Sequence, residues 1–161
     1  MRHQSTGFRS GRAATLIVVV TALLTWGISS ALAAPGEATR VSAHTSKYGM
    51  ALFGPSGKVL YVFGPDKGST SHCYGACASA WPPLLSTGAP LAGSGVNSKL
   101  LGTTKRTDGS VQVTYDGRPL YYYLADTPTK IMCQHANMHG GLWLIVKPSG
   151  QPNMAKGMTH M

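Results

Sequence analysis

Short stretches of alternating apolar and polar residues predict that the second half of the chain is built from strands. Residues 111–115 alternate with period two, which is typical of a half-buried strand. Asp116-Gly117 follows, and because both residue types tolerate positive φ, the pair favours a tight turn with residues 118–124 returning beside the strand. Residues 99–106 are expected to pair on its other side, and residues 142–147 to form a last apolar strand.

The first half of the chain shows a similar pattern. Residues 48–53 are expected to form a short strand, residues 54–57 to turn, and residues 58–63 to return. The Ala-rich segment 73–80 is expected to form one or two helical turns. Pro82-Pro83 would end them, because the residue before a proline avoids the helical region.

These two hairpins are copies of one sequence unit. Residues 57–66 and 117–126 share the order Gly, basic residue, any residue, Leu, Tyr, any residue, aromatic residue, two further residues and Asp, and a cysteine follows seven positions later in both. We therefore predict an all-β or β-rich fold in which two related hairpin modules, about residues 46–87 and 98–150, share one core. The motif residues are Tyr61, Phe63 and Asp66 in the first copy and Tyr121, Tyr123 and Asp126 in the second.

Both ends of the chain lie outside these copies. Residues 1–33 contain three arginines and no acid, then an uncharged apolar stretch, then Ala31-x-Ala33, which together indicate a secretory signal cleaved after Ala33. A retained membrane anchor is the alternative, although the apolar run is short for a span of about 20 residues. Residues 34–45 are small and polar and are expected to form a linker, and residues 151–161 a flexible tail bearing Met and His.

The composition is that of a folded domain with a basic surface. Charged residues make up 12% of the chain and apolar residues 43%, which argues against disorder. Three of the 14 basic residues lie in the signal, so the exported chain carries 11 basic against five acidic residues. This surplus could attract anionic polymers of the cell envelope. No nucleic-acid partner is expected, because the motifs of nucleic-acid-binding folds are absent, and no membrane span is expected after the signal.

The doubled Tyr-x-aromatic-x-x-Asp pattern, with Cys73-x3-Cys77 ahead of Trp81-Pro82-Pro83-Leu84, resembles the bacterial family called "secreted repeat of unknown function". Members of this family are also described as predicted lipoproteins. The similarity covers about residues 46–150 and implies an extracytoplasmic protein, and the family brings no established reaction with it. This chain has no cysteine near the cleavage site that could carry a lipid.

The three cysteines of an exported chain indicate one disulfide and one remaining thiol. The residues alone leave the pairs Cys73–Cys77, Cys73–Cys133 and Cys77–Cys133 open. The family resemblance favours Cys73–Cys77, because the first two cysteines recur more widely in the family than the third. This pairing would leave Cys133 free.

The repeated motif residues have structural and functional interpretations. Asp66 and Asp126 are each expected to cap a turn by accepting backbone N–H groups. The alternative is a pair of carboxylates facing each other across a pseudo-twofold axis, which could bind a cation or perform acid–base chemistry. Tyr61 and Tyr121 are expected to pack in the core with their hydroxyls at its rim, and an exposed aromatic strip for a sugar or another flat ligand is the alternative.

Residues 132–139 gather soft metal donors. Thiolate, imidazole and thioether groups are the set that selects Cu(I), with zinc second. The alternative is a loop whose Met and Cys pack beneath the sheet while its histidines face solvent. A thiolate–imidazole nucleophile is a more remote possibility, since no acid lies nearby to orient the imidazole. The candidate ligands are Cys133, His135, Met138 and His139, and the tail adds Met154, Met158, His160 and Met161.

These features predict a non-catalytic binding or structural module of the cell envelope. With five acids in the exported chain, a two-carboxylate hydrolase is disfavoured. An extracytoplasmic copper-binding protein is the alternative function, with copper as the candidate cofactor. A cysteine-dependent enzyme is the remote alternative.

Overall fold

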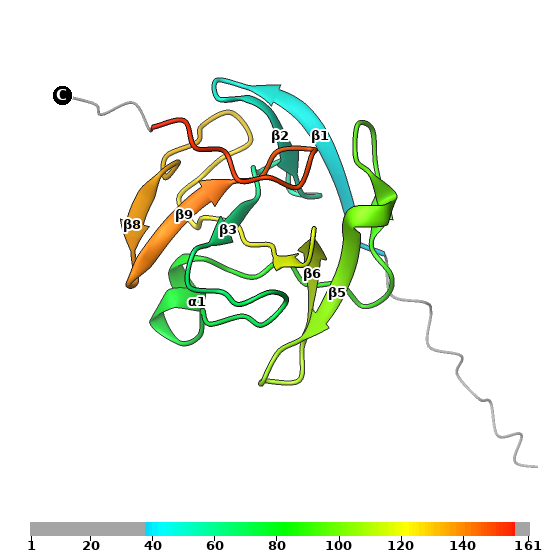
Figure 1. Ribbon diagram of the computed structural model, residues 1–161, viewed down its shortest axis with the longest axis vertical. Helices are drawn as coiled ribbons and strands as arrows, with labels where there is room; N and C mark the ends of the chain where they lie inside the picture. Colours follow the sequence, from blue (N-terminus) through cyan, green and yellow to red (C-terminus); the bar gives the residue numbers. More distant parts are fainter. Residues whose placement is uncertain (1–37, 157–161) are drawn as a thin grey trace, which may run out of the picture. The chain divides into compact units, whose positions relative to one another are not determined.

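The regular structure is almost entirely β-strand in the part of the chain that the structure describes, residues 38–156. The elements of this computed structural model are, in chain order, β1 (Arg40–Ser46), β2 (Gly49–Phe53), β3 (Tyr61–Phe63), α1 (Ala76–Ala80), β4 (Leu91–Ala92), the 3-10 turn η1 (Ser98–Leu100), β5 (Leu101–Lys105), β6 (Val111–Tyr115), β7 (Arg118–Pro119), β8 (Ala136–Met138) and β9 (Gly141–Ile145). They form three small sheets, ordered β2-β1-β4, β3-β9-β8 and β5-β6-β7 (Figure 1). The predicted β-rich class is confirmed.

The hairpin of β5 and β6 forms as the alternation predicts. Five residue pairs join the two strands, from Leu101 opposite Tyr115 to Lys105 opposite Val111. Asp116 (φ 50°) and Gly117 (φ 70°) both have positive φ, as the tight turn requires. The return is shorter than predicted, because β7 ends at its second residue and the chain then leaves β6 to pair with the first copy.

The two sequence copies build equivalent backbone arrangements that interlock. In each, three N–H groups and three carbonyls form a closed ring of hydrogen bonds of 2.8–3.1 Å. Two members of each ring belong to one copy. The third belongs to the other copy and lies three residues after its tryptophan, Trp143 in the first ring and Trp81 in the second. Neither copy therefore completes its own sheet. The rings consist of Leu52, Leu60 and Val146, and of Val113, Leu120 and Leu84.

The axis of this pseudo-symmetry passes between Tyr61 and Tyr121. The two residues pair antiparallel through reciprocal backbone bonds, with Tyr61 N donating to Tyr121 O (2.9 Å) and Tyr121 N to Tyr61 O (3.0 Å). Both side chains are completely buried. The prediction that the motif tyrosines occupy equivalent positions in one shared core is confirmed.

Aromatic side chains from both copies fill one part of this core. Trp81 and Trp143 stack with ring centroids 3.9 Å apart and planes 4° apart, and Phe63 stacks on the outer face of Trp143 at 4.2 Å. Tyr123 packs on Trp81 at 4.6 Å and remains partly exposed. Because burial of each large apolar side chain stabilises by about 1.5–3 kcal/mol, this cluster is a main source of the fold's stability.

The prediction that residues 34–45 form a linker is wrong from Arg40 onward. Here β1 pairs with β2 and with β4, and its Val41 and Ala43 are buried. The other residues of β1 are polar or small, so the strand has a weak hydrophobic signal and is stabilised by the neighbours that cover it. The folded domain therefore begins before residue 46. The segment between the two predicted copies contributes a further strand, β4.

The prediction of a flexible tail over residues 151–161 is wrong for its first part. Asn153 N donates to Ile145 O at 2.7 Å, and Asn153 Nδ2 donates to Tyr48 O at 2.7 Å. Gln134 Nε2 donates to the carbonyls of Asn153 and Ala155. Amide side chains thus fix a segment whose large apolar residue, Met154, is exposed to solvent. Met158, His160 and Met161 lie outside the described residues.

The predicted helical turn is confirmed as α1, which has five residues and ends before Pro82. Within residues 38–156, no helix is long and apolar enough to cross a membrane. The expected secretory signal, residues 1–33 with cleavage after Ala33, lies outside the described residues.

Candidate functional site

The motif tyrosines and aspartates form two hydrogen-bonded pairs that cross between the copies. Tyr61 Oη donates to Asp126 Oδ2 at 2.6 Å, and Tyr121 Oη donates to Asp66 Oδ2 at 2.8 Å. Each tyrosine thus reaches the aspartate of the other copy, 65 and 55 residues away along the chain. All four residues were predicted from the sequence as motif residues, whereas this exchange of partners was not.

The second oxygen of each aspartate caps its own turn. Asp66 Oδ1 accepts His72 N at 2.8 Å, and Asp126 Oδ1 accepts Met132 N at 2.9 Å. The predicted capping role is therefore confirmed in both copies. Since both oxygens of each carboxylate are occupied by N–H or O–H donors, the arrangement is one of structural ties between the copies.

The electrostatics of the two pairs follow from their burial. Burial, and next the negative charge of Asp126, raises the pKa of the Tyr61 hydroxyl far above its usual value. Burial also raises the pKa of Asp126 despite the two donors that face it. Asp126 is only 2% exposed, whereas Asp66 is partly exposed. The Tyr61–Asp126 pair is thus the more deeply buried of the two.

Arg106 supports the other pair and was not identified from the sequence. Its guanidinium is buried and donates to Ser71 Oγ (2.8 Å), to Gln112 Oε1 (2.7 Å) and to Cys73 O (2.7 Å). Ser71 Oγ in turn lies 2.8 Å from Tyr121 Oη. The signal that could have revealed this arginine is weak, because it lies at a strand end and its acceptors come from two separate segments, residues 71–73 and β6.

The cysteines pair as the family resemblance implied. Cys73 and Cys77 form a disulfide, and Cys133 is free and partly buried. Burial raises the pKa of the Cys133 thiol, which disfavours the thiolate. The free cysteine is therefore poorly activated for nucleophilic attack.

The candidate copper ligands are divided between the core and the surface. Cys133 and Met138 pack against the aromatic cluster, whereas His139 is exposed at the turn after β8. His135 and His139 both have positive φ, 60° and 53°. Among residues 38–156, no three His, Cys, Asp or Glu side chains form a group that could hold a metal ion. Copper binding by this segment stays a prediction.

Two cavities are lined by cations that form no ion pair within residues 38–156. One, of about 430 Å³, lies between the β1–β2 turn and the segment 128–131 and is bordered by Lys47 and Lys130. The other, of about 500 Å³, lies where β3, β9 and the Asp116-Gly117 turn meet, and Arg118 lines it. Neither cavity could be predicted from the sequence, since each combines residues from distant segments.

Two interlocked β repeats, tied by crossed tyrosine–aspartate pairs and carrying a disulfide, define a duplicated-repeat domain suited to an oxidising compartment. A family model described as "Secreted repeat of unknown function" matches residues 42–85 and again residues 102–147. The chain belongs to this family and contains two copies of its repeat. Both matches begin inside a first hairpin strand, β1 or β5, which agrees with the observed start of the domain. Comparisons with the curated proteins and with the solved structures found no match.

Proposed function

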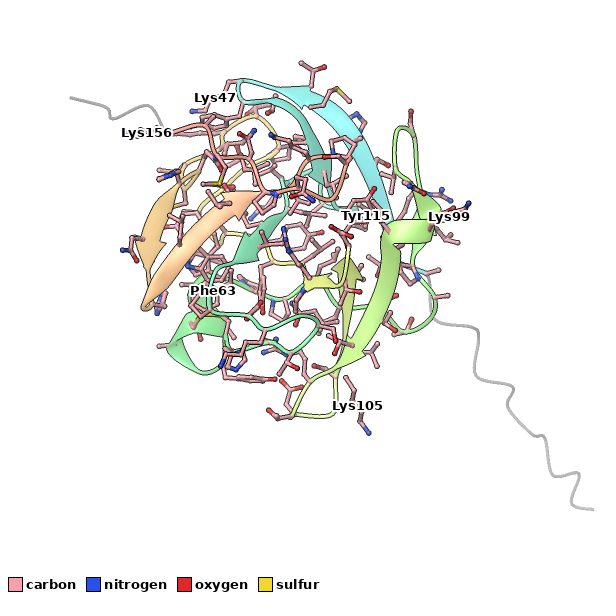
Figure 2. All side chains as sticks on the ribbon, viewed as in Figure 1. Lys47, Phe63, Lys99, Lys105, Tyr115 and Lys156 are labelled. Carbon is pink, nitrogen blue, oxygen red and sulfur yellow. A yellow bond between two sulfur atoms is a disulfide. The ribbon has the colours of Figure 1, made fainter. Side chains whose placement is uncertain are left out.

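We propose that this secreted-repeat protein is a non-catalytic module of the bacterial cell envelope that binds an anionic polymer there. The charge balance supports this function. All basic residues except Arg2, Arg9 and Arg12 lie in the described part of the chain, which thus holds 11 Lys and Arg against four Asp. In Figure 2, the labelled Lys47 and Lys105 are at the periphery. Such a surface raises the local concentration of polyanions.

The state of the carboxylates supports a non-catalytic role. Asp66 and Asp126 tie the copies together, and Asp108 accepts the backbone N–H and the hydroxyl of Ser110 in its turn. Acid–base catalysis needs a positioned group that is free to exchange a proton with a substrate. Only Asp116 among the four is exposed and outside such a tie, so residues 38–156 offer no pair of free carboxylates for catalysis.

The observation that carries the proposal is the groove beside Lys47 and Lys130. Two cations border it, and no carboxylate does. The rest of the lining combines hydroxyl and apolar side chains, which suits a polymer with repeating anions and hydroxyl groups. The remaining lining residues are Thr45, Ser46, Phe53, Pro128, Thr129 and Ile131.

Retention on insoluble cell-wall fragments and competition by soluble polyphosphate test this function at physiological salt. Lys47→Gln with Lys130→Gln should weaken binding about tenfold, because each exposed charge contact contributes up to about 1 kcal/mol. The matched control, Lys99→Gln with Lys105→Gln, removes the same charge from residues that line neither this groove nor the cavity beside Arg118. It should weaken binding by only about twofold. Absence of retention by the wild type would refute the function, and equal losses in the two double variants would refute the groove as its site.

Copper binding is the second candidate, and the asymmetry of the copies favours it. Cys73 is oxidised in a disulfide, while its counterpart Cys133 keeps a thiol and packs with Met138 against the same aromatic cluster. Anaerobic Cu(I) competition against a chelator tests this candidate. Wild type and the Cys133→Ser/His139→Ala variant should differ by about tenfold in affinity, and equal affinities would eliminate the segment.

A further inference from the structure

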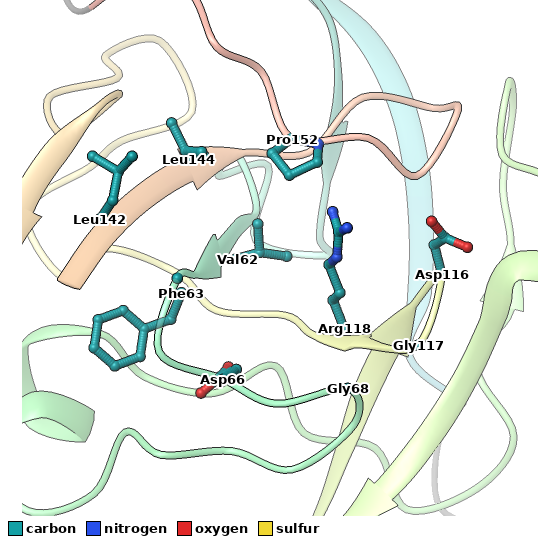
Figure 3. A pocket seen from close by; sticks show the side chains of 11 residues that line it. Val62, Phe63, Asp66, Gly68, Asp116, Gly117, Arg118, Leu142, Leu144 and Pro152 are labelled. Atoms are coloured by element: carbon teal, nitrogen blue, oxygen red, sulfur yellow. The ribbon is translucent and has the colours of Figure 1, made fainter.

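The cavity beside Arg118 combines opposite charges with an apolar wall. Val62 and Leu144, from β3 and β9, form the apolar side together with Leu142 and Pro152 (Figure 3). The guanidinium of Arg118 extends between Val62 and Asp116 in this view. The volume of about 500 Å³ lies in the range of small-molecule sites. This cavity does not include the groove residues of the proposed function.

Arg118 is a cation without a hydrogen-bond or ion-pair partner among the described residues. Its Nη1 atom is buried and makes no hydrogen bond. In residues 38–156 the one ion pair within 4.0 Å joins Arg106 to Asp108, so no carboxylate neutralises Arg118. Buried donors are nearly always paired in folded proteins, which makes this atom an exception that calls for a partner.

The pseudo-symmetry shows that this exception is not imposed by the fold. Lys58 occupies the position of Arg118 in the first copy, and its Nζ donates to Leu124 O at 3.1 Å. Gly64 is the counterpart of Leu124, and it lines the Arg118 cavity. Arg118 Nη1 nevertheless does not bond to the Gly64 carbonyl. The cation of the second copy, Arg118, is therefore unpaired, whereas the equivalent cation of the first copy, Lys58, donates a hydrogen bond.

The groups around the cavity define a zwitterionic ligand. A guanidinium matches a carboxylate by forming two parallel hydrogen bonds. Both oxygens of Asp66 are occupied by Tyr121 and His72, whereas Asp116 is exposed and can face an ammonium group. These two carboxylates would repel a phosphate dianion. We propose that the cavity binds a free α-amino acid with an aliphatic side chain, its carboxylate on Arg118, its ammonium toward Asp116 and its side chain over Val62 and Leu144.

Titration of the folded protein with leucine, followed by amide NMR shifts, tests this assignment. L-leucine and D-leucine are both tested, and saturable shifts at Gly64 and Gly117 are expected with at least one of them. Leucinamide, which lacks the carboxylate, and 4-methylpentanoate, which lacks the ammonium, should each bind about tenfold more weakly. Absence of saturable shifts with both enantiomers, or equal binding of leucine and leucinamide, would overturn the proposal.

Variants separate the two charged contacts. Arg118→Gln should weaken leucine binding about tenfold or more, and Arg118→Lys should also weaken it, because an ammonium lacks the guanidinium fork. Asp116→Asn should weaken leucine but leave 4-methylpentanoate within about twofold. Lys105→Gln is the control with the same charge loss and should leave the affinity unchanged. Near-ultraviolet circular dichroism verifies that each variant is folded, and unchanged affinity in Arg118→Gln would refute the site. Failure here leaves the polymer function untouched, since that test depends on Lys47 and Lys130.

Discussion

The strongest structural prediction concerns the Tyr61–Asp126 tie between the copies. Tyr61→Phe removes one hydroxyl and preserves the ring, so packing against the aromatic cluster stays intact. Asp126 then loses its 2.6 Å hydrogen bond while it remains buried. A hydrogen bond to a charged, buried acceptor contributes about 1.5–3 kcal/mol. We expect Tyr61→Phe to lower the free energy of unfolding by about 2 kcal/mol.

The effect of Tyr61→Phe should depend on whether Asp126 is present. In Asp126→Ala the Tyr61 hydroxyl has lost its acceptor, and replacing both partners of a hydrogen bond by apolar groups is close to neutral. Tyr61→Phe in that background should therefore change stability by less than about 0.5 kcal/mol. Urea unfolding of wild type, the two single variants and the double variant yields the coupling free energy between Tyr61 and Asp126, which is expected to be about 2 kcal/mol.

The other tie provides the matched control. Tyr121→Phe combined with Asp66→Ala should show a smaller coupling, about 1 kcal/mol, because Asp66 is partly exposed and Tyr121 Oη also lies beside Ser71 Oγ. Additive effects at Tyr61 and Asp126, with a coupling below about 0.3 kcal/mol, would show that the crossed pair does not tie the copies together.

Three further predictions concern pH, the disulfide and the buried arginine. Because burial raises the pKa of Asp126, the folded protein keeps the carboxyl proton of Asp126 at a pH where the unfolded chain has lost it. Asp126 therefore stabilises the fold most below about pH 4, and this stabilisation is lost as pH rises through the pKa of the folded state. Urea unfolding at a series of pH values should show a smaller decline in stability for Asp126→Asn than for wild type. Cys73→Ser with Cys77→Ser should lower the free energy of unfolding by about 2 kcal/mol, the chain-entropy value for so short a loop. Wild type unfolded without reductant should show one thiol, which maps to Cys133, whereas three thiols would contradict the disulfide. Arg106→Met should lower the free energy of unfolding by about 2–4 kcal/mol in the same assay, since it removes the donor that three buried acceptors share; a loss below about 1 kcal/mol would contradict the supporting role of this arginine.

Some features follow from the sequence because they are local. The alternation in residues 111–115 and the Asp116-Gly117 turn specify a hairpin through backbone preferences that need no distant partner. The duplication is likewise visible in the sequence, and equivalent segments of similar sequence adopt equivalent structures. For that reason Tyr61 and Tyr121 could be predicted to occupy equivalent positions, although their pairing with each other could not.

Other features depend on neighbours that are remote in sequence. β1 has too few apolar residues to be recognised, and it is a strand because β2 and β4 supply hydrogen bonds along both of its edges. The segment around Asn153 is ordered by amide contacts to Tyr48 and Gln134, which no periodicity reveals.

The repeat, the second hairpin and the residues of the motif can all be predicted from the amino-acid sequence. The folded structure is needed to see that each tyrosine bonds to the aspartate of the opposite copy, and that Arg118 remains unpaired while Lys58 donates a hydrogen bond. A repeated motif specifies identical local geometry, whereas side-chain partners depend on how the two copies dock. Docking exchanges contacts across the pseudo-twofold axis and gives equivalent residues different surroundings.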